Sequence, residues 1–127
     1  MRLDALKSMY DFYNKTLFGG RLVNDVAMVI TGAKKYYGSA WCIYEGEGTT
    51  NRIYKIHFAK QIERSRHPLV NYNTIMIHEM IHIFQYMTYP QKAMLAKGAA
   101  NHDKVFFNWL DMIEYQHGIK MYRDFEV

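Results

Sequence analysis

The stretch Val70–Tyr86 decides the fold, and it reads VNYNTIMIHEMIHIFQY. Its apolar residues recur at spacings of three and four, which predicts a long helix over this range. We expect the helix to end before Pro90, because the residue preceding a proline is pushed out of helical geometry. Within the helix, His78, Glu79 and His82 form the pattern His-Glu-x-x-His. The stretch is therefore a candidate metal site.

The spacing of these three residues suits zinc chemistry. Histidines four positions apart lie about 40° apart around a helix and about 6 Å apart along it, so two imidazoles can bind one Zn²⁺. Glu79 would project beside the metal, where it can activate a zinc-bound water and pass the proton to a leaving amine. Bulky aliphatic residues fill the opposite arc of the helix, so the polar triad should face a cleft. The competing interpretation is a buried helix with hydrogen-bonded core histidines.

A catalytic zinc usually has three protein ligands and one open position, so a third ligand is needed. We expect it to be His102, at the start of a last helix from about His102 to Gln116, with Asn101 as N-cap and Gly118 as stop. His102 falls on the same stripe as Phe106, so it should face the long helix.

Carboxylates near His102 are the rival third ligands. Asp103 follows it directly, and Asp111 and Glu114 lie further along the same helix. Carboxylates at such positions more often face solvent or interact with the helix N-terminus, which favours His102 over them.

The remaining pattern predicts an α+β fold. The first eighteen residues form an amphipathic helix that Gly19-Gly20 should end. Residues 45–51 are typical of a loop and should connect the second and third strands as a hairpin. Gly38 is expected at a bulge or a close backbone approach. The three expected strands are Val26–Thr31, Tyr36–Tyr44 and Arg52–Phe58.

Composition limits the class of protein. With 127 residues, of which 50% are hydrophobic, we expect one folded domain spanning 1–127 and exclude general disorder. No apolar run is long enough to cross a membrane, and no secretory signal is visible, so we expect no membrane partner. The single cysteine, Cys42, excludes an internal disulfide and indicates a reducing, cytoplasmic environment. A net charge of +4 permits a nucleic-acid partner without requiring one.

Three segments together resemble a known family. Residues 13–22, YNKTLFGGRL, are similar to the N-terminal motif of SprT-like zinc metalloprotease domains of the SprT and Spartan type. His78–His82 followed by His102-x-x-x-Phe106 resembles the two histidine motifs of that family, and Gly38–Cys42 stands where the family has a glycine-aromatic-cysteine strand. The resemblance covers roughly residues 8–115. It implies a zincin-like fold with an N-terminal helix, a three-stranded sheet, a His-Glu-x-x-His helix and a C-terminal helix that carries the third ligand.

The resemblance also implies a function. It predicts a zinc-dependent metallopeptidase with His78, His82 and His102 on the metal, Glu79 as the catalytic residue and a protein as substrate. Spartan cleaves proteins crosslinked to DNA, so DNA-associated proteins and DNA contact are implied. The sequence departs from the family in having Asp103 where glycine is usual, and one cysteine cannot form the zinc ribbon of many bacterial members. A minimal form, of a size common in bacteriophage genomes, is implied; a phage protein would work in the host cytoplasm.

Weaker signals leave alternatives open. Lys34–Tyr37 and Arg64–His67 are basic clusters that could contact nucleic acid, although solvated loops are the commoner explanation. Tyr86 shares the face of the triad and could line the cleft, and Arg52–Phe58 could pair with an extended substrate. Two other functions stay open: a nucleic-acid-binding accessory protein with a structural or vestigial metal, and a small scaffold with core histidines. We expect the remaining residues of interest, His57, His67, His117 and Cys42, not to bind metal.

Overall fold

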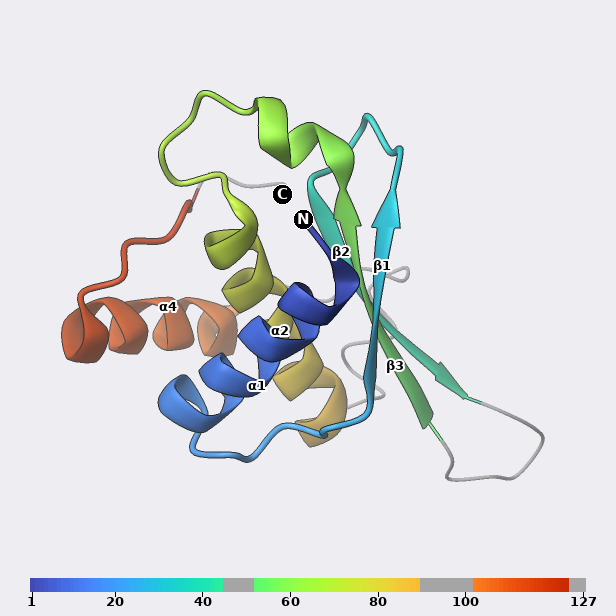
Figure 1. The fold of residues 1–127 in the computed structure, drawn as a ribbon. Helices are drawn as coiled ribbons and strands as arrows, with labels where there is room; N and C mark the ends of the chain where they lie inside the picture. Colours follow the sequence, from blue (N-terminus) through green and yellow to red (C-terminus); the bar gives the residue numbers. More distant parts are fainter. Residues whose placement is uncertain (45–51, 90–101, 124–127) are drawn as a thin grey trace.

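The computed structural model describes residues 1–44, 52–89 and 102–123, and within them the fold is α+β as predicted (Figure 1). No helix among these residues is both long enough and apolar enough to cross a membrane. The expected loop 45–51 and nearly all of the connector before His102 lie outside the described residues. In chain order the elements are α1 (Leu3–Leu17), β1 (Val26–Thr31), β2 (Gly38–Tyr44), β3 (Arg52–Ala59), the short 3₁₀ helix η1 (Lys60–Arg64), α2 (Tyr72–Thr88) and α4 (Lys104–His117).

The three strands form one mixed sheet in the order β1-β3-β2. β2 and β3 are antiparallel, with Ala40 opposite Ile56, so the pairing expected of a hairpin is confirmed. β1 runs parallel to β3, with Met28 opposite Ile56. The prediction that Arg52–Phe58 could pair with a substrate is wrong, because β3 is the central strand and its two edges already bond to β1 and β2. Among the described residues, β2 is an edge strand.

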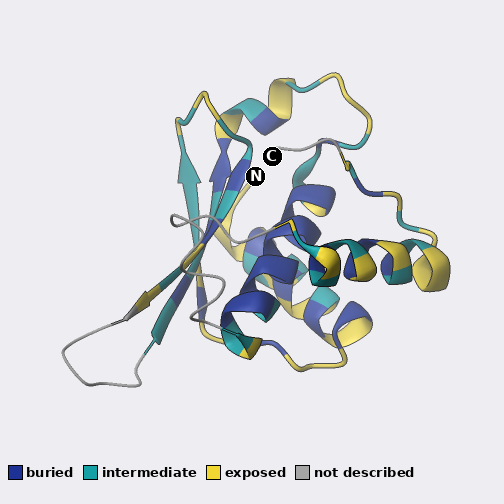
Figure 2. Ribbon diagram, turned by 180° about the vertical axis from the view of Figure 1, so that it is seen from behind, coloured by how far each residue is buried: buried dark blue, intermediate teal, exposed yellow. Residues whose placement is uncertain are grey.

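The helices gather on one side of the sheet, and α2 lies between the sheet and α4 (Figure 1). Twelve of the seventeen residues of α2 are buried, so its burial extends around most of the helix and is not confined to the aliphatic arc (Figure 2). Along β2 the residues alternate as a half-buried strand should: Ala40 is buried and Trp41 is exposed. The core is thus built around the helix that carries the His-Glu-x-x-His pattern.

Helix ends show where local signals were misread. α2 begins after Asn71, whose side chain accepts from the Thr74 backbone N–H while the Thr74 hydroxyl accepts from the Asn71 N–H. The last helix does not begin at His102 with Asn101 as N-cap: its N-cap is Asp103, whose side chain accepts from Phe106 N. Asn and Asp cap helices about equally well, so composition alone does not separate the two positions.

Candidate metal centre

Three histidine side chains from two segments meet at one point. His78 and His82 come from the middle of α2, and His102 precedes the N-cap of α4. His78 Nε2 lies 3.2 Å from His82 Nε2 and 3.2 Å from His102 Nε2. One ligand atom from each of the three lies within 4.8 Å of the others. The structure thus brings together the residues that the sequence predicted as ligands.

The distances from His78 to the other two histidines fit a tetrahedral metal ion. Nitrogens bound to one Zn²⁺ at about 2.0–2.1 Å in tetrahedral geometry are roughly 3.3–3.4 Å apart, close to the two Nε2 separations found here. His78 and His82 are buried, whereas His102 is exposed. The prediction that His102 faces the long helix and not solvent is therefore half right, since its ring reaches His78 from a solvent-accessible position.

Phe106 supports the cluster from the first turn of α4. Its ring centroid is 4.5–4.9 Å from the centroids of all three imidazoles. It stacks on His82 and His102, with interplanar angles of 17° and 29°. A buried aromatic ring in this position limits the rotamers that the imidazoles can adopt.

The electrostatics of the site keep the imidazoles of His78 and His82 neutral. Burial, together with the neighbouring rings of His82 and His102, lowers the pKa of His78 well below its usual range. Burial also lowers the pKa of His82 to about 4, although the hydrogen bond of its Nδ1 to Gln85 Oε1 opposes this shift. Neutral imidazole is the form that binds metal, so both rings are ready ligands at neutral pH.

Glu79 lies deep in the same helix, only 2% exposed. Its Oε2 is buried and has no hydrogen-bond partner among the described residues. Burial raises the pKa of this carboxyl well above its usual range. A carboxyl with a raised pKa is suited to taking up and releasing a proton during catalysis.

The backbone of β2 approaches Glu79 at Gly38. A Cβ added to Gly38 would lie 2.6 Å from Ile75 Cγ2 and 3.0 Å from Glu79 Oε2. The expected close approach at this glycine is therefore confirmed. Tyr86, which the sequence left as a residue that could line the cleft, is 2% exposed and donates from its hydroxyl to the Ala40 carbonyl at 3.3 Å. These contacts join β2 to α2 along the length of the site.

The rival ligands lie elsewhere. Asp103 accepts hydrogen bonds from Gln85, Tyr89 and the Phe106 backbone. Asp111 and Glu114 form ion pairs with Arg123. Within the described residues, the cluster of possible ligands contains His78, His82 and His102 and none of these carboxylates, nor His57, His67, His117 or Cys42.

Sequence reasoning missed Gln85. Its side chain is fully buried, and its Oε1 lies 2.6 Å from His82 Nδ1. A signal was present, because a residue seven positions after His78 falls about 20° from it around the helix. Gln85 therefore belongs to the polar face of α2 that the triad defines.

A small hollow borders the cluster at His78. Its wall includes Met121 and Tyr122, which follow α4 and pack back over the start of α2. The other lining residues are Leu69, Thr74 and Ile75. The side of the cluster toward the start of α2 is therefore mainly apolar.

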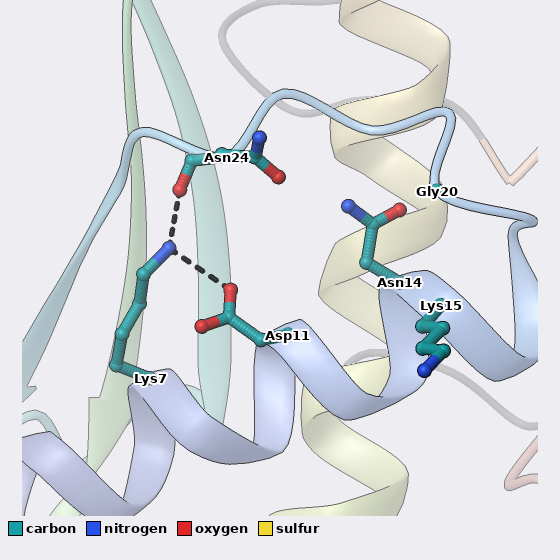
Figure 3. Close-up of a pocket in the computed structure, with 6 residues that line it drawn as sticks. All are labelled: Lys7, Asp11, Asn14, Lys15, Gly20 and Asn24. Atoms are coloured by element: carbon teal, nitrogen blue, oxygen red, sulfur yellow. Dashed lines mark hydrogen bonds and ion pairs between the residues drawn. The ribbon is translucent and has the colours of Figure 1, made fainter.

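A second hollow lies on α1 and the loop after it (Figure 3). Lys7, one of its lining residues, bonds to the Asn24 carbonyl and lies 3.3 Å from Asp11 Oδ1. Its other lining residues are Asn14, Lys15 and Gly20. None of the six belongs to the histidine cluster, and we assign this hollow no part in the chemistry.

The two basic clusters lie at one end of the sheet. The Gln61 side chain donates to the Tyr36 carbonyl at 2.7 Å, which joins η1 to the turn containing Lys34 and Lys35. The His67 ring lies 4.8 Å from that of Tyr122, which lines the hollow beside His78. His67 of the second cluster therefore contacts a residue that borders the site.

The chain matches the model of the SprT-like family over residues 6–124, nearly the whole chain. The chain belongs to the SprT-like family. The resemblance predicted from residues 13–22 and the two histidine motifs is thereby confirmed. None of the curated proteins compared with the chain matches it. For this SprT-like chain, family and geometry together indicate a metal-dependent enzyme.

Proposed function

We propose that this SprT-like protein is a zinc-dependent metallopeptidase that hydrolyses peptide bonds, with DNA-associated proteins as the substrate class. The observation that carries the proposal is the convergence of His78, His82 and His102 beside a buried glutamate of the same helix. His78 Nε2, at 3.2 Å from the Nε2 atoms of both His82 and His102, supports a three-histidine zinc site with one position left for water or substrate. When bound there, Zn²⁺ supplies a Lewis acid that polarises the scissile carbonyl and acidifies water.

The protein's own residues supply the rest of the reaction. Glu79 accepts a proton from the attacking water and delivers it to the nitrogen of the leaving amine. Its burial favours this role, because a carboxyl with a raised pKa holds the proton until the amine needs it. Phe106 keeps the three imidazoles in place, and Gly38 leaves room for the Glu79 carboxyl between α2 and β2.

Replacing Glu79 by Gln tests this assignment. The amide nearly matches the carboxyl in shape but cannot accept the proton, so hydrolysis should fall at least about 100-fold while bound zinc per chain is unchanged. Cleavage is measured on labelled casein and on histones bound to single-stranded DNA. Glu114→Gln, a glutamate of α4 outside the cluster, is the matched control and should retain wild-type cleavage.

The same preparations separate the alternatives. Equal cleavage by wild type and Glu79→Gln would show that the mechanism is wrong. Wild-type protein that binds DNA with or without metal, and cleaves neither substrate, would favour a nucleic-acid-binding accessory protein. Absence of metal in protein purified without chelators, checked by elemental analysis of wild type and His102→Ala, would favour a scaffold with core histidines.

A further inference from the structure

We propose that Gln85 and Asp103 are positioning residues for the metal centre: together they fix the tautomer of His82 and hold α2 and the start of α4 together as one hydrogen-bonded unit. This inference rests on the proposed metal site and concerns how the chain prepares it. It begins at His82, whose Nδ1 lies 2.6 Å from Gln85 Oε1 while its Nε2 faces His78.

The orientation of the Gln85 amide follows from its second contact. Gln85 Nε2 donates to Asp103 Oδ1 at 3.1 Å. A carboxylate accepts hydrogen bonds and does not donate them, so the amide NH₂ must face Asp103 and the amide oxygen must face His82. Asp103 also receives the Phe106 backbone N–H on Oδ1 and the Tyr89 hydroxyl on Oδ2. These two further donors show that the carboxyl acts as an acceptor, which supports the orientation of the Gln85 amide with its NH₂ toward Asp103.

This orientation of the amide determines which ring nitrogen of His82 carries the proton. An amide oxygen only accepts, so His82 Nδ1 must carry the hydrogen that joins it to Gln85. Nε2 of the neutral ring is consequently left with its lone pair, directed toward the point where His78 and His102 also converge. Hydrogen bonds of this kind to metal-binding imidazoles orient the ring and raise its basicity.

Asp103 also links these hydrogen bonds to the segment that holds the third histidine. It is the N-cap of α4, and it directly follows His102. The Tyr89 hydroxyl lies 3.2 Å from Asp103 Oδ2, so the residue that follows α2 is bonded to the N-cap residue of α4. A glycine, which the family resemblance predicts at this position, would supply none of these side-chain contacts. The aspartate therefore makes a connection of this chain's own between the two segments that hold the histidines.

The test has a readout that does not depend on activity. Long-range ¹H–¹⁵N NMR on the metal-free and the zinc-loaded full chain reports which His82 nitrogen carries the proton. We expect Nδ1–H in both. A predominantly Nε2–H ring in the metal-free wild type would overturn the proposal, and this measurement needs no variant and no metal. Failure of wild-type protein to bind zinc would instead count against the proposed function.

Matched variants separate positioning from helix capping. Asp103→Ser keeps a good N-cap but loses the carboxyl that orients Gln85, whereas Asp103→Asn retains an acceptor oxygen for both Phe106 N and Gln85. We expect Asp103→Ser and Gln85→Met to lower zinc affinity about 10–100-fold in chelator competition, and Asp103→Asn to stay near wild type. If Asp103→Ser retains wild-type zinc affinity and an unchanged His82 tautomer, the aspartate serves only as a helix cap and the proposal is wrong. Gln85→Met with wild-type affinity would contradict it equally.

Discussion

At the scale of single residues, the site depends on how closely β2 approaches α2. Glu79 is buried against the backbone of β2 at Gly38, and nothing larger than hydrogen fits between them. A carboxyl in such a position is desolvated by backbone and aliphatic atoms, which is the cause of its raised pKa. Gly38 has no positive φ, so its role is to leave space and not to permit an unusual backbone conformation.

Gly38→Ala tests this close approach. The added methyl group would meet Ile75 Cγ2 at 2.6 Å and Glu79 Oε2 at 3.0 Å, so either the strand or the helix must shift. We expect a loss of about 1–3 kcal/mol in the free energy of unfolding, as is typical of overpacked cores, measured by urea denaturation. Gly32→Ala is the control, because a Cβ there meets nothing within 4 Å and should leave stability within about 0.5 kcal/mol. Equal stability of the two variants would contradict the close packing.

At the scale of elements, the structure explains the N-terminal motif, residues 13–22. Asn14, 4% exposed near the end of α1, donates from Nδ2 to the Leu22 carbonyl and accepts from the Leu22 N–H on Oδ1, both at 3.0 Å. Gly19 and Gly20, with φ of 62° and 75°, turn the chain back so that these two bonds can form. The motif therefore fastens the loop leading to β1 onto α1.

Asn14→Asp should weaken that fastening in a pH-dependent way. At neutral pH a carboxylate oxygen would face the Leu22 carbonyl, and we expect a loss of about 1–3 kcal/mol in unfolding free energy. A protonated aspartic acid can donate to that carbonyl, so the pKa of the new group is raised in the folded state. Stability relative to wild type should then recover as pH falls toward about 4, the unfolded value. Asn108→Asp, on an exposed position of α4, is the control for added charge. A deficit that does not change with pH would contradict this account.

Periodicity predicted the elements well and their ends less well. The apolar spacing in α2 and the alternation in β2 are direct consequences of burial, so the sequence carries them. The central place of β3 could not be predicted from the sequence. Alternation along a strand shows which side chains are buried, but it does not show which strand lies beside it or whether the two run parallel or antiparallel. The periodicity of the sequence also could not predict the Gln85–Asp103 contact. It joins residues eighteen positions apart, and their contact depends on how α4 packs.

At the scale of the whole molecule, the proposed metal centre would also connect the two parts of the chain that supply its histidines. α2 lies in the core against the sheet, whereas His102 and α4 come from the last described segment. A ligand that binds the folded state and not the unfolded state stabilises the fold by mass action, by about 4.1 kcal/mol at a thousandfold excess over Kd. Zinc should therefore stabilise the entire chain.

The size of that stabilisation should depend on pH. His82 has a pKa of about 4 in the metal-free fold against 6.5 for an ordinary histidine, so the unfolded chain takes up a proton first as pH falls. The metal-free protein should thus lose stability as pH falls from about 6.5 to about 4. Protons compete with zinc for the same imidazole nitrogens, so the increment from zinc should also shrink over that range.

Thermal unfolding with and without zinc, at pH 7 and pH 5, measures both effects. We expect a clear rise in Tm with zinc at pH 7 and a smaller one at pH 5. His102→Ala should remove most of the increment while leaving the metal-free Tm close to wild type, because this side chain is exposed. His117→Ala, an exposed histidine outside the cluster, should keep the full increment. An equal zinc increment in wild type and His102→Ala would mean that the ion binds without the third histidine, and the two segments would then not be joined through the metal.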